Sequence, residues 1–90
     1  MKVAMTVSGK VQGVGFRYMT KIAADDIGVF GIVKNLENGN VYIEAMGEED
    51  KVTAFIEVIK KSPAPFGKVN HIDFEYNPSF KDYTKYSVTY

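Results

Sequence analysis

Apolar and polar residues alternate in several short stretches of the chain, and a period of two is typical of a half-buried strand. Val3, Met5 and Val7 show this pattern first, and the β-branched valines favour the same structure. Asn38-Gly39 predicts a hairpin between the second and third strands, because both residues tolerate a positive φ. The predicted strands cover residues 3–7, 29–36, 41–46, 71–76 and 86–90, with Gly31 interrupting the second.

Two longer stretches carry apolar residues at helical spacing. The first predicts a helix from about residue 17 to residue 27, with Gly28 as its C-terminal cap. Its apolar residues are Met19, Ile22, Ala23 and Ile27. The second helix is expected to begin at the acidic residues 48–50, which lie at the positive end of its dipole, and to end before Pro63. Its buried face is predicted to hold Val52, Phe55, Ile56 and Ile59.

The order of these elements is strand, helix, strand, strand, helix, strand, with an additional C-terminal strand. This order predicts an α+β fold, a ferredoxin-like sandwich in which two helices cover one face of a mainly antiparallel sheet. We expect a single domain over residues 1–90. In this fold the first two strands run parallel with the third between them. The carboxyl ends of the first two strands should therefore lie about 10 Å apart at one edge of the sheet. The loop at residues 9–16 and Asn35 would face each other across that gap.

Charge and composition narrow the possible partners. The chain has 11 basic and 11 acidic residues, and a neutral chain has no general field that attracts polyanions. The absence of cysteine excludes disulfides, thiol catalysis and cysteine metal sites. No apolar run approaches membrane-spanning length, and the N-terminal stretch is too short for a secretory signal. We therefore expect a cytoplasmic monomer that binds neither nucleic acid nor membranes.

The glycine-rich segment at residues 9–15 carries the clearest chemical signal. Its three glycines allow a tight curl that exposes backbone N–H groups, and such groups form an anion nest. The helix that follows adds the positive end of its dipole. Arg17 lies at this helix start, where a cation is unfavourable. An anion held by the loop would explain Arg17, because a guanidinium binds two phosphate oxygens at once.

Other interpretations of this loop are weaker. It lacks the Gly-Lys-Ser/Thr ending of a P-loop and the third glycine of a dinucleotide-binding fingerprint. Residues 13–18 faintly resemble an RNA-recognition sequence, but that sequence lies on a strand and this segment precedes a helix. The loop could also be a plain connection, and Asn35 a plain turn residue, although long loops in small domains are usually functional.

Two segments resemble the signatures of a known family. Residues 9–17, Gly-Lys-Val-Gln-Gly-Val-Gly-Phe-Arg, are similar to the first signature of the acylphosphatases. Residues 31–41, Gly-Ile-Val-Lys-Asn-Leu-Glu-Asn-Gly-Asn-Val, continuing to Gly47, are similar to the second. The resemblance covers the whole chain in length and element order. It implies a ferredoxin-like fold and hydrolysis of the carboxyl–phosphate bond of acyl phosphates. It also implies a small-molecule acyl phosphate as partner and no metal or other cofactor.

By the same resemblance, Arg17 and Asn35 are the catalytic residues. The phosphate would be bound by Arg17 and by the backbone of Gln12, Gly13, Val14, Gly15 and Phe16. We expect the side-chain carbonyl of Asn35 to accept a hydrogen bond from the attacking water, whose proton passes to a phosphate oxygen of the substrate. A carboxylate leaving group, with a pKa near about 4, needs no general acid.

The chain departs from the family pattern at two places. Ile32 stands where an aromatic residue usually follows the first glycine of the second signature, and we expect this to affect packing only. The family often has an arginine close to the C-terminus, whereas residues 86–90 hold none. The resemblance therefore leaves open any C-terminal contribution to substrate binding or stability, and the expected chemistry is unaffected.

The remaining candidate residues have structural interpretations. His71 is expected on the surface, and Asp25 and Asp26 on a solvated helix face. The tyrosines near the C-terminus are expected to complete the core or cover a sheet edge; they are Tyr83, Tyr86 and Tyr90. Two rival functions stay open: a module of the same fold that binds an anion without turnover, and an RNA-binding sheet.

Overall fold

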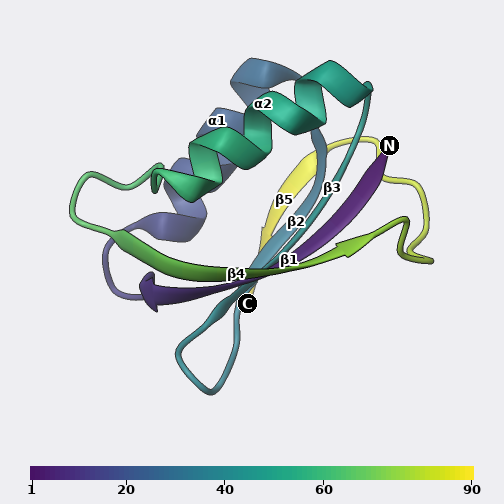
Figure 1. The fold of residues 1–90 in the computed structure, drawn as a ribbon. Helices are drawn as coiled ribbons and strands as arrows, with labels where there is room; N and C mark the ends of the chain where they lie inside the picture. Colours follow the sequence, from purple (N-terminus) through teal and green to yellow (C-terminus); the bar gives the residue numbers. More distant parts are fainter.

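Two helices pack against one face of a five-stranded sheet in the computed structural model, which describes residues 1–90 (Figure 1). The elements are β1 (Lys2–Lys10), α1 (Phe16–Ile27), β2 (Phe30–Asn35), β3 (Val41–Met46), α2 (Glu49–Lys60), β4 (Lys68–Tyr76) and β5 (Tyr86–Thr89). The predicted α+β class, element order and layer arrangement are confirmed. Neither helix is long and apolar enough to cross a membrane.

The order of the strands brings three carboxyl ends to one edge of the sheet. The order is β4-β1-β3-β2-β5, and every neighbouring pair is antiparallel except β2 and β5, which are parallel. Because β3 lies between β1 and β2, those two strands run in the same direction. The position of β5 does not follow from the sequence pattern. Its parallel pairing with β2 carries the last residues of the chain to the same edge.

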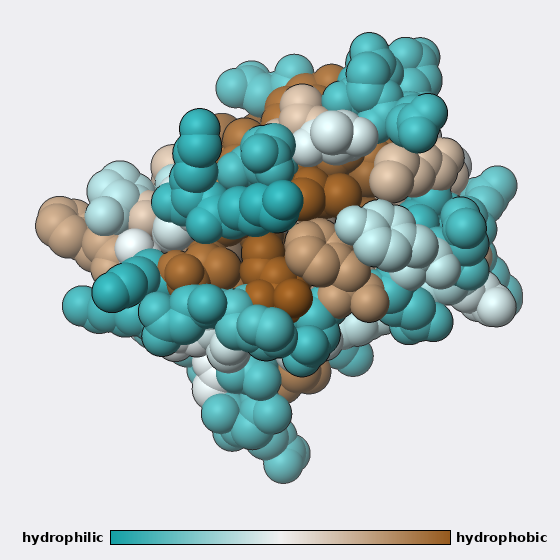
Figure 2. All heavy atoms as spheres, in the orientation of Figure 1, coloured by the Kyte–Doolittle hydropathy of each residue, from teal (hydrophilic) through white to brown (hydrophobic).

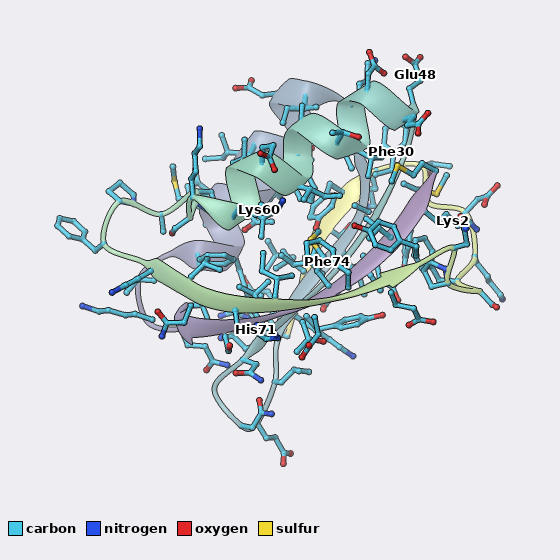
Figure 3. The ribbon with its side chains drawn as sticks, viewed as in Figure 1. Lys2, Phe30, Glu48, Lys60, His71 and Phe74 are labelled. Atoms are coloured by element: carbon cyan, nitrogen blue, oxygen red, sulfur yellow. The ribbon has the colours of Figure 1, made fainter.

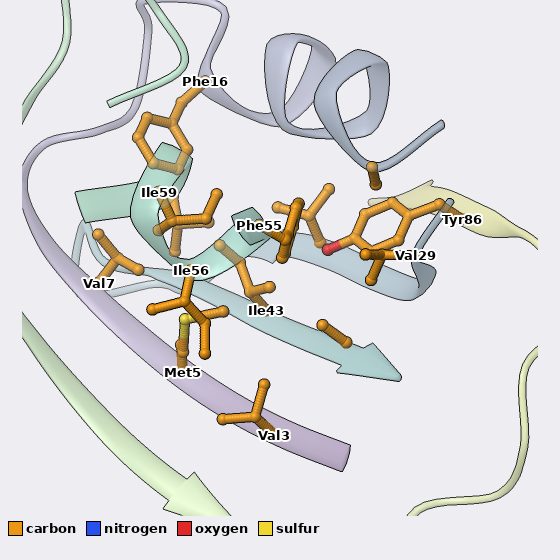
Figure 4. Packing of buried hydrophobic residues seen from close by; sticks show 14 of the residues in the cluster. Val3, Met5, Val7, Phe16, Val29, Ile43, Phe55, Ile56, Ile59 and Tyr86 are labelled. Carbon is orange, nitrogen blue, oxygen red and sulfur yellow. The ribbon is translucent and has the colours of Figure 1, made fainter. Parts of the chain in front are cut away.

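The core lies between the sheet and the helices (Figure 4). Val41, Ile43 and Ala45 of β3 are fully buried, as their alternation predicts. The predicted face of α2 is also confirmed, since Val52, Phe55, Ile56 and Ile59 are all buried. Tyr86 completes this core: its ring lies 5.7 Å from that of Phe55, and its hydroxyl donates to the carbonyl oxygen of Ile32 at 2.9 Å.

The predicted apolar face of α1 is correct in part, since Met19 and Ile27 pack against the core. The helix buries Phe16, Thr20 and Ala24, which lie four residues apart, and leaves Ile22 exposed at 39%. Phe16 begins the helix and inserts its ring into the core, which sets the rotation of the whole helix (Figure 4). The other two buried residues of α1, Thr20 and Ala24, are small and allow the helix to approach its neighbours closely. Hydrophobicity alone therefore misses Thr20 and Ala24 and wrongly includes Ile22.

Strand β1 is longer than the alternation predicts. It continues through Gly9 to Lys10, with a change of register between Ser8 and Gly9 where it pairs with β4. Gly9 has a φ of 132°, and a Cβ there would overlap the carbonyl oxygen of Lys68. Such a bulge bends and twists its strand. The irregularity lies two residues before the loop that leads to α1, so it helps to set the direction of that loop.

Strand β4 forms one edge of the sheet, and α2 only partly covers it. Figure 2 shows apolar surface between the two elements, in a groove that includes Ile72 and Phe74. In Figure 3, Phe74 points from β4 toward the helix layer and His71 points away from it. His71 is on the surface, as predicted, and pairs with Asp73 at 2.8 Å.

Candidate active site

A pocket of about 200 Å³ opens where β1, β2 and β5 end and α1 begins. Residues from the glycine-rich loop, the start of α1, the end of β2 and the C-terminus line it. They are Val11, Gln12, Gly13, Gly15, Phe16, Arg17, Tyr18, Asn35, Val88 and Tyr90. The pocket thus brings together Arg17, Asn35 and most of the loop residues that the sequence singled out. Four of its residues were not predicted: Val11, Tyr18, Val88 and Tyr90.

The loop adopts the backbone conformation that its glycines predict. Gly13 and Gly15 have φ values of 74° and 78°, which favour glycine, and Gly15 caps α1 without any side-chain hydrogen bond. The backbone N–H groups from Gly13 to Arg17 make no hydrogen bond within the chain. Free N–H groups at a helix start, together with the helix dipole, favour an anion. The pocket therefore has the backbone of an anion-binding site.

Val14 is the one residue of the predicted cradle that does not line the pocket. Its side chain packs against the hydrophobic core instead. That contact anchors the middle of the loop while the glycines on either side bend around it. A role for Val14 toward a ligand is thus limited to its backbone, and this role stays a prediction.

Arg17 is the second residue of α1 and carries the only formal positive charge that lines the pocket. Its guanidinium donates to the carbonyl oxygen of Thr89 at 3.3 Å and lies 4.8 Å from the centre of the Tyr90 ring. No carboxylate pairs with it. A guanidinium has five N–H donors, so most of them are free for a ligand. The C-terminal segment thus contacts Arg17 although it holds no arginine.

Asn35 ends β2, where it pairs with Val41 of β3. Its carbonyl oxygen Oδ1 is buried and has no hydrogen-bond partner. The expectation that this oxygen accepts a hydrogen bond from the attacking water stays a prediction. Leaving a buried polar group unpaired costs about 1–3 kcal/mol. Asn35 lines the pocket and its side chain makes no hydrogen bond within the chain, so the amide is available to an external partner.

Gln12 connects the loop to the β2–β3 hairpin. Its Nε2 donates to the carbonyl oxygen of Leu36 at 2.9 Å and to that of Asn40 at 2.8 Å. Leu36 follows Asn35 directly in the chain. The side chain of Gln12 therefore holds the anion-binding loop against the strand that carries Asn35. The sequence predicted only a backbone role for this residue.

The ionisable groups with strongly shifted pKa values lie outside the pocket. Burial and a hydrogen bond to Glu44 raise the pKa of Tyr83 to about 12 and also raise the pKa of Tyr42. Burial raises the pKa of Tyr86 well above its ordinary value. No histidine or carboxylate side chain lines the pocket, and no group of three or more His, Asp or Glu side chains in the chain could hold a metal ion.

Comparison with known proteins identifies the family. The family model described as Acylphosphatase matches residues 3–88. An acylphosphatase of Lactiplantibacillus plantarum is 55% identical over 71 residues, 79% of each chain, and one of Enterococcus faecalis is 46% identical over 97% of this chain and 96% of its own. The crystal structure of the Bacillus subtilis acylphosphatase superposes with a TM-score of 0.92 at 37% identity, covering 99% of this chain and 98% of that one. The chain therefore belongs to the acylphosphatase family, whose function is the hydrolysis of acyl phosphates.

Proposed function

We propose that the pocket hydrolyses the carboxyl–phosphate bond of acyl phosphates and needs no metal for it. One observation carries the proposal: an unpaired guanidinium, a row of free backbone N–H groups and an unused amide line the same pocket. Family membership supplies the reaction class. The first two features suit a phosphoryl group, and the third suits a water molecule.

The phosphoryl group would lie in the curl of the loop. Backbone N–H groups between Gly13 and Arg17 would donate to its oxygens, and the Arg17 guanidinium would bind two of them. Phosphoryl transfer depends on charge stabilisation and positioning more than on covalent chemistry. Donors that are already oriented need no reorganisation as charge develops in the transition state. The rigid loop and the stacked arginine provide such donors.

The chemical step needs no acid or base from the protein. The oxygen of a water molecule attacks phosphorus in line, and the bond from phosphorus to the carboxylate oxygen breaks. The electron pair leaves with the carboxylate, whose pKa near about 4 makes protonation unnecessary. The proton of the water passes to a phosphate oxygen. These reaction steps agree with a pocket that has no histidine or carboxylate side chain.

Asn35 would hold the attacking water through its amide. The buried, unpaired Oδ1 gains a partner once the amide turns and accepts a hydrogen bond from that water. Aligning a nucleophile in this way matters, because a misplacement of about 1 Å can cost a rate factor of about 100. Asn35 thus acts on the position of the nucleophile, while Arg17 and the loop act on the phosphate.

Turnover of benzoyl phosphate by the purified protein tests this function. We expect hydrolysis to benzoate and phosphate, competitive inhibition by inorganic phosphate, and no loss of rate in EDTA. Phosphate binding without hydrolysis would instead identify an anion-binding module. Loss of activity in EDTA that added metal restores would contradict the metal-free mechanism.

The contact made by Gln12 leads to a prediction of its own. Gln12→Leu removes both hydrogen bonds and leaves two carbonyl oxygens without that donor. The free energy of unfolding should therefore fall by about 1–3 kcal/mol. The loop and Asn35 would also lose their alignment, and kcat for benzoyl phosphate should fall by about 10- to 100-fold. Urea unfolding and steady-state kinetics measure the two effects. A folded variant with unchanged kcat would limit Gln12 to a structural role.

We further propose that the chain acts as a single domain and as a monomer in the cytoplasm. Its zero net charge gives it no general attraction for nucleic acids. The acylphosphatases of Enterococcus faecalis and Bacillus subtilis match this chain over nearly their whole lengths, which supports a self-contained domain.

A further inference from the structure

Two exposed aromatic side chains border the pocket, and the proposed chemistry gives neither of them a contact with the phosphate or the water. Tyr18 is 65% exposed and follows Arg17 on α1. Tyr90 is fully exposed and ends the chain after β5. Both line the pocket, although they come from different elements. Large apolar groups gathered at a concave site, and left open to water, are typical of a binding surface.

The lining of the pocket is divided by its chemistry. The loop N–H groups, Arg17 and Asn35 supply donors and an amide, whereas Tyr18, Val88 and Tyr90 supply apolar surface. A phosphoryl group satisfies the first set and makes no use of the second. An acyl phosphate also has an organic part, and that part lies next to the phosphate. The apolar residues are therefore available to the acyl group.

We infer that Tyr18 and Tyr90 form an acyl-binding subsite that selects acyl phosphates with an aromatic acyl group over those with a small aliphatic one. The inference rests on the proposed function and names the substrate class of the same pocket. The guanidinium carbon of Arg17 lies 4.8 Å from the centre of the Tyr90 ring. Tyr18 is 65% exposed, so its ring is free to pack on a ligand. Aromatic pairs favour offset or edge-to-face packing, which a benzoyl group can adopt and an acetyl group cannot.

Tyr18 is the residue to change, because Tyr90 also touches Arg17. Alanine is a better helix former than tyrosine, so Tyr18→Ala should fold. We expect it to lower kcat/KM for benzoyl phosphate about three- to tenfold, as the loss of one aromatic contact implies, and to change that for acetyl phosphate less than about twofold. Tyr18→Phe should retain the benzoyl preference, and the inhibition constant of inorganic phosphate should be the same in all three proteins.

Tyr76→Ala serves as the matched control, since Tyr76 is similarly exposed at 58% but lies on β4 and outside the pocket. It should leave the ratio of the two kcat/KM values unchanged. The inference is overturned if Tyr18→Ala leaves the ratio of the two kcat/KM values as in the parent, whether both values fall equally or neither changes. The proposed function fails separately, if the parent protein hydrolyses neither substrate.

Discussion

Replacement of Arg17 by alanine should lower kcat/KM for acyl phosphates by about 1,000-fold, the scale seen when one preorganised donor or charge is removed from a transition state. Arg17 carries the only formal positive charge that lines the pocket and has no carboxylate partner. The loss should affect binding as well as rate, so the inhibition constant of inorganic phosphate should rise strongly. Arg17→Lys should recover only part of the activity, because an ammonium cannot bind two oxygens in the planar geometry of a guanidinium.

Stability should respond very differently to the same change. Arg17→Ala removes a cation from a helix N-terminus, which stabilises by about 0.3–1 kcal/mol. It also removes the contacts with Thr89 and Tyr90, and a cation–π contact at an exposed site is worth about 0.5–1 kcal/mol. The two effects nearly cancel, so the free energy of unfolding should change by less than about 1 kcal/mol. An inactive but normally stable variant would place the role of Arg17 in catalysis and not in folding.

Lys21→Ala is the matched control for Arg17. Lys21 lies one turn further along α1, outside the pocket, where it pairs with Asp25 at 2.8 Å. This variant loses a cation from the helix, an ion pair, and the hydrogen bond from Lys21 Nζ to the carbonyl oxygen of Tyr86 at 3.1 Å. It should keep its activity within about twofold, because exposed ion pairs contribute little and Lys21 does not line the pocket. If Arg17→Ala, folded by circular dichroism, loses no more activity than Lys21→Ala, Arg17 does not act on the phosphate.

The part of this architecture that the sequence predicts depends on local signals. Alternation and helical spacing identify every strand and both helices, and two glycines with positive φ mark the curl of the loop. The face of α1 is not predictable in this way, since Phe16 at its start sets the rotation and Thr20 and Ala24 are weak hydrophobic signals. Tertiary packing decides that choice, and the periodicity of α1 alone does not contain it.

The residues of the site also differ in whether a local sequence signal predicts them. Arg17 and Asn35 carry sequence signals because their residue types suit a phosphate and a water. The contributions of Gln12, Tyr18 and Tyr90 depend on contacts between segments far apart in the chain, such as Arg17 and Thr89 at a sequence separation of 72. The parallel pairing of β5 with β2 brings Thr89 and Tyr90 to the pocket, and the β2–β3 hairpin supplies the contacts of Gln12. No local pattern predicts the partner of a terminal strand, so these residues emerge only from the fold.

Asn35→Ala should separate positioning of the nucleophile from binding of the phosphate. We expect kcat for benzoyl phosphate to fall by about 100-fold or more, because the water loses its alignment. The inhibition constant of inorganic phosphate should change less than about threefold, since phosphate would be bound by Arg17 and the loop, on which this variant does not act. Asn35→Asp should weaken phosphate binding as well, because a carboxylate repels the phosphoryl oxygens.

Unfolding measurements on Asn35→Ala add a second, independent readout. The parent protein buries the Oδ1 of Asn35 without a partner, and this costs about 1–3 kcal/mol. Alanine removes that oxygen, so the variant should be at least as stable as the parent while it loses turnover. Asn70→Ala, at an exposed residue of β4, is the matched control and should change neither property. A residue that is kept for catalysis at the expense of stability is expected to behave in this way: its replacement lowers turnover and does not lower the free energy of unfolding. If Asn35→Ala instead keeps near-parental kcat, or loses phosphate binding as strongly as Arg17→Ala, then Asn35 does not position the water.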